Sequence, residues 1–264
     1  PSPEVTLLHY EKNLIHTEIL TLNLLKKKTS LPVPEVIHDS RADEYMGGSH
    51  WFLMQFMEGQ AYNRVKETLP GDSKDKIARR LGGYVREINN IRGPLFGYPG
   101  IPDEQSQMWG DAFPAMLEGI LEDGIKENVP LPRGYDEIRR LAEKDYSALS
   151  EVRLPSLIHW DLWDGNIFVK DGEITGIIDC ERALWADPLM EQNFSQISHQ
   201  ERAFFKGYGR GLPETEGEKA RRRLYDLYLF LIMVIETYYR RFVPNEQIKW
   251  SYPLLEKFLT AYPQ

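Results

Sequence analysis

The chain has 264 residues and a formal net charge of −8 at pH 7, because 40 Asp and Glu outnumber 32 Lys and Arg. Hydrophobic residues make up 42% and aromatic residues 12%, which is enough for a sizeable core and excludes a mainly disordered chain. The acidic balance, with a pI near 5.4, argues against a nucleic-acid-binding protein, which needs an excess of clustered Lys and Arg.

The single cysteine, Cys180, excludes an intramolecular disulfide framework and a thiolate metal cluster. Because such cysteine usage is typical of a reducing compartment, we predict a cytoplasmic protein. No basic segment followed by an apolar stretch is visible at the start of the sequence, so we expect no secretory signal. The longest apolar run, Leu229–Ile235, is far shorter than the roughly 20 residues of a membrane-spanning helix. It predicts a buried core helix and no membrane partner.

Apolar residues at helical spacing predict a first helix over 10–28. Prolines follow it, and short strands are predicted over 35–38 and 51–57. After Gly59 the pattern is mainly helical, and the later helices are predicted over 73–90, 113–128, 135–149, 200–208, 217–242 and 254–262. The predicted fold is α+β, with a small mixed lobe over 1–59 and a large helical lobe over 60–264. The glycine-containing run 207–211 lacks the Lys-Ser/Thr of a phosphate-binding loop and predicts a flexible loop.

One β-hairpin interrupts the helical lobe. Asp171-Gly172 between two β-favouring runs predicts a two-residue turn that pairs Lys170 with Glu173 and, counting back, Asn166 with Ile177. Strand side chains alternate between faces, so Asp179 is expected on the face of Asn166, at a diagonal position. A carboxylate and an amide carbonyl are oxygen ligands that suit Mg²⁺ beside nucleotide phosphates.

A histidine, an aspartate and an asparagine precede this hairpin at kinase-like spacing. His159, Asp161 and Asn166, followed by Asp179 at the end of the hairpin, reproduce the catalytic loop and metal-binding elements of kinases. The alternative is that these residues form turns and strand ends. For His159, hydrogen bonds that order the loop are the preferred interpretation over a chemical role.

The sequence resembles the aminoglycoside phosphotransferase and choline kinase-like family, the small-molecule relatives of protein kinases. The loop 159–166 (HWDLWDGN) resembles the family's catalytic loop, although Trp160 stands where glycine is frequent. The segment 177–181 (IIDCE) resembles its metal-binding segment, and 186–188 (ADP) resembles the short motif after it, with Glu191 in the place of a later acidic residue. The resemblance covers nearly the whole chain and implies a two-lobe, protein-kinase-like fold.

The resemblance also implies roles for individual residues. Asp161 would be the base that orients the acceptor hydroxyl, with His159 in the same loop, and Asn166 and Asp179 would hold Mg²⁺. ATP or GTP would be the co-substrate.

Upstream, Glu18 resembles the helix glutamate that pairs with a phosphate-binding lysine, although a solvated helix-face Glu is a comparable alternative. The strand and hinge 52–59 would place Met54 beside the nucleotide base and the backbone of Gln55 and Met57 at its edge, although an apolar strand would look similar without a nucleotide. Residues 1–46 contain no glycine, and the expected glycine-rich turn and strand lysine are absent. We expect an N-terminally trimmed chain; the alternative is a protein that lacks part of its nucleotide site.

The predicted acceptor is a small hydroxyl compound. Only seven residues separate Asp179 from Asp187, which leaves no room for a protein-kinase activation segment. The acidic balance favours a cationic acceptor such as an aminoglycoside, amino sugar or choline-like amine, without excluding a macrolide or a sugar. Residues that could contact it are Asp111, Glu118, Glu122, Asp123, Glu236, Trp109, Tyr238 and Tyr239. The alternatives are a non-catalytic nucleotide-binding or regulatory protein and a structural interaction module, and the oligomeric state stays open.

Overall fold

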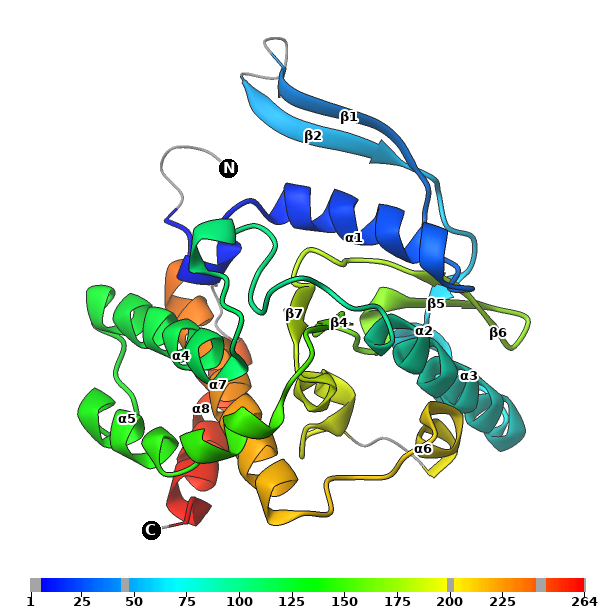
Figure 1. Ribbon diagram of the computed structural model, residues 1–264. Helices are drawn as coiled ribbons and strands as arrows, with labels where there is room; N and C mark the ends of the chain where they lie inside the picture. The colour runs from blue at the N-terminus through cyan, green and yellow to red at the C-terminus, as the bar shows by residue number, and fades with distance from the viewer. Residues whose placement is uncertain (1–5, 44–47, 199–201, 241–245, 264) are drawn as a thin grey trace.

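The computed structural model describes residues 6–43, 48–198, 202–240 and 246–263. Its arrangement is a small N-terminal part with one helix and a two-stranded sheet, set on a larger helical part (Figure 1). The α-helices are α1 (Leu14–Lys28), α2 (Tyr62–Val65), α3 (Gly71–Asn89), α4 (Trp109–Lys126), α5 (Tyr135–Glu143), α6 (Arg202–Tyr208), α7 (Glu216–Arg240) and α8 (Glu246–Ala261). The strands are β1 (Val36–Asp43), β2 (Ser49–Met54), β3 (Gln60–Ala61), β4 (Ser156–Ile158), β5 (Ile167–Lys170), β6 (Glu173–Ile177) and β7 (Leu184–Ala186).

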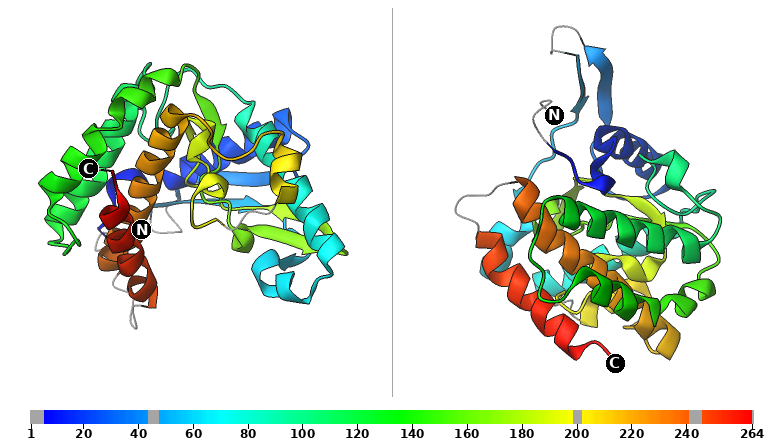
Figure 2. Two further views of the ribbon diagram at one scale, coloured as in Figure 1. Left: turned by 90° about the horizontal axis from the view of Figure 1, so that it is seen from below. Right: turned by 90° about the vertical axis from the view of Figure 1, so that its left-hand side faces the viewer.

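The antiparallel pair β1–β2 projects beyond α1, away from the helical lobe (Figure 2, right). β1 continues to Asp43, well past the predicted end at residue 38, while β2 ends at Met54 rather than at residue 57. Apolar side chains on this pair stay exposed, among them Ile37 and Leu53. The small lobe is therefore held to the molecule mainly through α1 and the segments that flank it.

The predicted hairpin is the pair β5–β6, and β3 adds a third strand to it. Gln60 pairs with Val169 and Ala61 with Phe168, so the connector after β2 runs directly along the hairpin. On the other side, the backbone N–H of Ile177 donates to the carbonyl of Pro32 at 2.8 Å. The segment between α1 and β1 and the connector after β2 are thus both bonded to the same hairpin.

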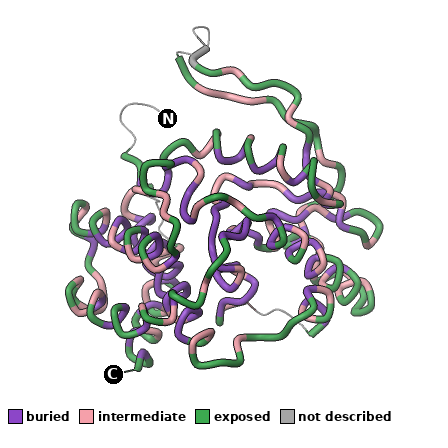
Figure 3. The backbone as a smooth tube through the Cα atoms, in the orientation of Figure 1, coloured by how far each residue is buried: buried purple, intermediate pink, exposed green. Residues whose placement is uncertain are grey.

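Buried residues concentrate in the helical lobe, where α7 forms the centre (Figure 3). The apolar run Leu229–Ile235 lies in the middle of α7 and is buried apart from the half-buried Met233, which confirms the predicted core helix. Within the described part of the chain, no helix combines the length and apolarity needed to cross a membrane. α8 begins at Glu246 instead of residue 254, because the helix continues through Pro253.

Helices α3 and α6 approach each other closely because two glycines lie between their backbones. A Cβ on Gly82 would overlap the carbonyl oxygen of Phe204, and a Cβ on Gly207 would overlap that of Arg79. The prediction of a flexible loop from residue 207 is therefore wrong at its start. Gly207 belongs to α6, and the chain leaves the helix at Gly209, whose φ of 93° suits glycine.

The adjacent glycines Gly82 and Gly83 offer a matched test of this packing. Gly83→Ala is expected to raise the free energy of unfolding by about 0.5 to 1 kcal/mol, because its Cβ meets open space and alanine favours the helix. Gly82→Ala is expected to lower it by about 1 to 3 kcal/mol, because α3 and α6 must separate. Urea unfolding of both variants measures the difference; equal effects of the two substitutions would contradict this packing.

Candidate active site

The catalytic-loop candidate, residues 159–166, connects β4 to β5, and a buried carboxylate holds its start. Glu191 is fully buried. It accepts hydrogen bonds from the backbone N–H of His159 and of Trp160, both at 3.0 Å, and from the amide of Asn89 at 3.1 Å. The role of the acidic residue after the ADP motif is thus to fix the backbone of the loop.

The backbone conformation of Trp160 explains why the family's loop frequently has glycine at this position. Its φ is 65°, in the left-handed region that costs side-chain-bearing residues free energy. The indole is nevertheless 2% exposed and packs against Tyr10 and Tyr228, with ring centroids 6.3 Å and 5.6 Å away. Aromatic packing and the hydrogen bond to Glu191 offset the backbone strain.

The loop is bonded to the predicted metal segment through Ile178. The Nε2–H of His159 donates to the carbonyl of Ile178 at 3.1 Å, and the N–H of Ile178 donates to the carbonyl of Asn166 at 3.1 Å. Burial lowers the pKa of His159, which favours the neutral ring. The hydrogen bond of His159 therefore orders the loop, which is the role that we preferred for this residue from the sequence. Asn166 and Asp179 are consequently brought to adjacent points of the hairpin's end.

The predicted register of the hairpin is wrong by one residue. Lys170 pairs with Glu173 as expected, but Ile177 pairs with Ile167 and not with Asn166. The cause is a bulge at Thr175, whose hydroxyl donates to the carbonyl of Glu58. Asp179 lies beyond the end of β6 with a φ of 67°, so its direction is set by a left-handed backbone and not by strand alternation.

Asn166 is oriented so that the oxygen of its side-chain amide stays available as an acceptor or metal ligand. Its Nδ2 donates to the backbone carbonyl of Asp161 at 2.9 Å, which leaves the side-chain carbonyl as a free acceptor. Among the described residues there is no group of three or more His, Cys, Asp or Glu side chains that could hold a metal ion. An amide oxygen and the Asp179 carboxylate form a sparse donor set, which fits Mg²⁺ completed by water and phosphate oxygens.

Asp161 is half-buried between the loop and the residues that follow the metal segment. Burial raises the pKa of its carboxyl group to about 6; the Arg182 guanidinium opposes the shift and the Asp179 carboxylate adds to it. A carboxylate with a raised pKa is a better proton acceptor than an exposed one. This environment suits the role that the resemblance implies for Asp161.

Sequence reasoning missed Arg182, which lies beside Asp161. Its guanidinium lies 5.3 Å from the Tyr10 ring centroid and 3.2 Å from the Glu236 carboxylate. Arg240 continues the network, 3.7 Å from Glu236 and 2.7 Å from Glu11. This ion-pair network is largely buried, and the charges of Arg182 and Glu236 act on the pKa of Asp161 in opposite directions. The sequence feature that could have identified this residue is the position of an arginine only three residues after Asp179.

Glu18 is 6% exposed on α1, so the alternative of a solvated helix-face Glu is wrong. Its carboxylate accepts hydrogen bonds from the backbone N–H groups of Cys180 and Asp179. Burial raises the pKa of Glu18 to about 8, and the carboxylates of Asp179 and Glu181 add to the shift. Its Oε2 is buried without a hydrogen-bond partner. The pairing with a lysine stays a prediction.

The hinge candidates lie where β2 leads into β3. Gln55 donates its N–H to the carbonyl of Glu35 at 2.8 Å, and its side-chain Oε1 accepts from the N–H of Glu35 at 3.4 Å. Met57 packs on Gly176 of β6, where an added Cβ would lie 3.1 Å from the Cβ of Met57. Met54 ends β2 and is 37% exposed. Met57 thus lies against the β5–β6 hairpin, while Met54 and Gln55 pair with Val36 and Glu35; contact of the three residues with a nucleotide base stays a prediction.

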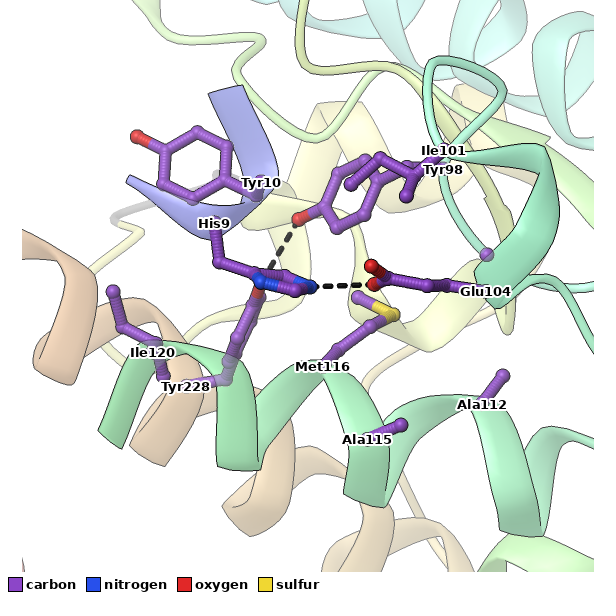
Figure 4. Close-up of a pocket in the computed structure, with 11 residues that line it drawn as sticks. His9, Tyr10, Tyr98, Ile101, Glu104, Ala112, Ala115, Met116, Ile120 and Tyr228 are labelled. Carbon is purple, nitrogen blue, oxygen red and sulfur yellow. Dashed lines mark hydrogen bonds and ion pairs between the residues drawn. The ribbon is translucent and has the colours of Figure 1, made fainter. Parts of the chain in front are cut away.

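The short 3-10 helix η1 (His9–Glu11) fastens α1 to the helical lobe. In Figure 4 the His9 ring points to the Glu104 carboxylate, 2.5 Å away, and the hydroxyls of Tyr98 and Tyr228 meet at 3.0 Å. The N–H of His9 donates to Asp123 at 2.6 Å. The cavity between these residues measures about 10 Å³, which is room for about one water molecule and too small for a substrate.

Several of the side chains predicted to contact an acceptor already make contacts within the protein. Trp109 is buried and donates to Tyr225, Glu118 pairs with Arg139, and Asp123 holds η1. Packing, hydrogen bonds and an ion pair within the protein thus already involve these three side chains, and contact of the predicted set with an acceptor stays a prediction. Among the described members of this set, Glu236 pairs with Arg182, and both charges affect the pKa of Asp161.

Solved structures share this fold at low sequence identity. The chain superposes on a candidate fructosamine-3-kinase from Haemophilus somnus with a TM-score of 0.70 at 19% identity, covering 98% of this chain and 82% of that one. It superposes on an aminoglycoside phosphotransferase in complex with GDP and kanamycin with a TM-score of 0.63 at 18% identity, covering 95% and 83%. These likenesses confirm the two-lobe, kinase-like α+β fold.

Curated relatives match over less than two thirds of their own length. A chloroplastic protein-ribulosamine 3-kinase of Arabidopsis thaliana is 21% identical over 81% of this chain and 64% of its own. An aminoglycoside 3'-phosphotransferase of Enterococcus faecalis is 28% identical over 65% of this chain and 61% of its own. The profile of the phosphotransferase enzyme family matches residues 7–224, which is most of the chain. The chain therefore belongs to the phosphotransferase enzyme family.

Proposed function

We propose that this protein transfers the γ-phosphoryl group of ATP or GTP to a hydroxyl group of an amino sugar or a related small amine. One observation carries the proposal: hydrogen bonds through Ile178 and Asn166 join Asp161 and Asp179 into one site, beside the cation of Arg182.

The nucleotide would bind between the small lobe, residues 1–59, and the helical lobe, residues 60–264. Met54, Gln55 and Met57 would contact its base. Asn166 and Asp179 would hold Mg²⁺, which neutralises phosphate charge when it is bound. Glu18 keeps the segment of Asp179 in place through the two backbone N–H groups that it binds, and its unpartnered oxygen suits a cationic partner.

Phosphoryl transfer requires mainly that the chain position the acceptor hydroxyl and the nucleotide phosphates. Asp161 would accept a hydrogen bond from the acceptor hydroxyl and take its proton as the oxygen attacks the γ-phosphorus, while the bond from the γ-phosphorus to the β–γ bridging oxygen breaks and the nucleoside diphosphate leaves. Arg182 would limit the repulsion between the Asp161 carboxylate and the approaching phosphates. The carboxylate of Glu181 is among the charges that act on Asp161 and would attract an acceptor ammonium group, whereas Glu236 is already paired with Arg182 and Arg240. Ribulosamine, fructosamine and aminoglycosides, after which the relatives are named, carry both hydroxyl and amine groups.

A panel of acceptors tests this function. With labelled γ-phosphate and the full-length protein, we expect transfer to amino sugars, ketosamines or aminoglycosides, and no transfer to serine-containing peptides. Neutral sugars of matched shape are the control, and the lack of an amine is expected to raise their KM. Nucleotide binding without transfer to any hydroxyl compound would instead favour a non-catalytic nucleotide-binding or regulatory protein.

A further inference from the structure

The connector between the two lobes continues past β3 into α2 and from there reaches the loop 159–166. Its earlier residues are bonded to the β5–β6 hairpin, because Glu58 accepts from the hydroxyl of Thr175 and Gln60 pairs with β5. Lys66 follows α2 and contacts the loop itself, since its ammonium lies 2.7 Å from the Asp164 carboxylate. One short stretch of chain thus contacts both the hairpin and the loop proposed to hold Mg²⁺.

The ammonium of Lys66 is restricted by an aromatic ring as well as by its ion pair. It lies 5.3 Å from the ring centroid of Tyr62 on α2, a side chain that is itself buried. A cation over a ring face is attracted electrostatically, which limits the freedom of an otherwise flexible side chain. The side chains of Lys66 and Asp164 are 36% and 28% exposed, so water screens their attraction only in part. The pair is therefore better defined than one on an open surface.

Asp164 begins a single 3-10 turn, η6 (Asp164–Asn166), whose last residue is the proposed Mg²⁺ ligand Asn166. No side chain caps the start of this turn, and the described residues give the Asp164 carboxylate one partner, Lys66. A 3-10 turn this short has few hydrogen bonds of its own, so a contact at its first residue influences the direction of its last. The ion pair therefore acts two residues away from the metal ligand.

We propose that Lys66 is a positioning residue, whose ion pair with Asp164 holds η6 in the orientation in which the side-chain oxygen of Asn166 binds Mg²⁺. Lys66 acts through Asp164 and the turn, without touching the metal or the nucleotide. The connector, whose earlier residues would contact the nucleotide base, thereby also sets the geometry of the metal site. This inference rests on the proposed function, because it takes Asn166 as a metal ligand.

The quantity that tests this role is the Mg²⁺ gain, the ratio of nucleotide affinities measured with and without Mg²⁺ by calorimetric titration of the full-length protein. A partly exposed ion pair can bias the position of a turn by no more than its own interaction free energy, which corresponds to about two- to fivefold in an equilibrium constant. Lys66→Met is therefore expected to lower the Mg²⁺ gain by about this factor and to leave the affinity without Mg²⁺ unchanged. Lys66→Arg keeps a cation for Asp164 and should retain the gain.

Asp164→Asn distinguishes positioning from a direct effect of charge on the nucleotide. If the two charges acted directly on the anionic nucleotide, loss of the Lys66 cation would weaken binding and loss of the Asp164 carboxylate would strengthen it. If the pair positions the turn, both substitutions lower the Mg²⁺ gain. The double variant then lowers it no further, because each single substitution removes the same interaction.

Lys170→Met is the matched control, because Lys170 pairs with Glu58 at 2.6 Å between the same connector and the same hairpin, but next to the hairpin's turn. It should keep the wild-type Mg²⁺ gain, and all variants should keep the wild-type Tm. A full gain in Lys66→Met, opposite changes in Lys66→Met and Asp164→Asn, or a Tm that falls together with the gain would overturn the inference and leave the metal site standing. A wild-type protein without any Mg²⁺ gain would contradict the proposed metal site itself, and the inference would fall with it.

Discussion

Replacement of Asp161 with Asn is expected to lower kcat by about 10² to 10⁴ while leaving nucleotide affinity nearly unchanged. The substitution keeps the shape of the side chain and removes the charge that would accept the acceptor proton. The loop should stay in place, because Asn166 bonds to the backbone carbonyl of Asp161 and not to its side chain. Steady-state kinetics with an established acceptor, together with nucleotide titration, measure both quantities.

Asp171→Asn is the matched control for this change. Asp171 is exposed in the turn of the same hairpin and has a φ of 52°, which Asn tolerates well. The control should keep wild-type kcat and KM. Near wild-type kcat in Asp161→Asn, under conditions where chemistry limits turnover, would contradict the assignment. A joint loss of turnover and nucleotide affinity would move Asp161 into the metal shell.

Glu191→Leu is expected to lower the free energy of unfolding by roughly 2 to 6 kcal/mol, because two buried backbone N–H groups lose their acceptor at about 1 to 3 kcal/mol each. The donors are those of His159 and Trp160, so the same change should also lower kcat by releasing the loop. Glu191→Gln keeps one acceptor oxygen and should give an intermediate loss of stability. Urea unfolding and kcat measurements on both variants test this order.

Glu216→Gln is the surface control for Glu191. Its carboxylate pairs with Lys219 at 2.8 Å but is 87% exposed, so water replaces the partner and the unfolding midpoint should stay unchanged. If Glu191→Leu unfolded at the wild-type midpoint, the carboxylate would not be what holds the loop. A normal kcat in a destabilised Glu191→Leu variant would limit its role to folding.

The hairpin shows how far local sequence rules reach. Asp171-Gly172 identified the turn and both strands, because turn chemistry is local. The register beyond the turn depended on the bulge at Thr175, which forms only because Glu58 of the connector offers a carbonyl from a distant segment. Asn166 lies near the segment of Asp179 because the N–H of Ile178 donates to its carbonyl, and not through the strand alternation that we expected; a metal ion shared by the two side chains stays a prediction.

The surroundings of Asp161 were harder to predict because they come from tertiary packing. Arg182 is near Asp179 in sequence, but its contacts with Tyr10 and Glu236 join segments more than 50 residues apart. No periodicity distinguishes Glu236 from other charged positions on helices. Similarly, Gly207 looks like a loop residue until the backbone of α3 is placed beside it.

Calorimetric titration of the full-length protein with ATP and with GTP, with and without Mg²⁺, tests the proposed metal–nucleotide site most directly, because this measurement needs no knowledge of the acceptor. We predict that Mg²⁺ raises the affinity for at least one of the two nucleotides and that Asp179→Asn removes this increase, while Asp171→Asn retains it. Affinity for both nucleotides that does not depend on Mg²⁺, or a Mg²⁺ effect that survives unchanged in Asp179→Asn, would contradict a metal–nucleotide site at the end of the catalytic hairpin.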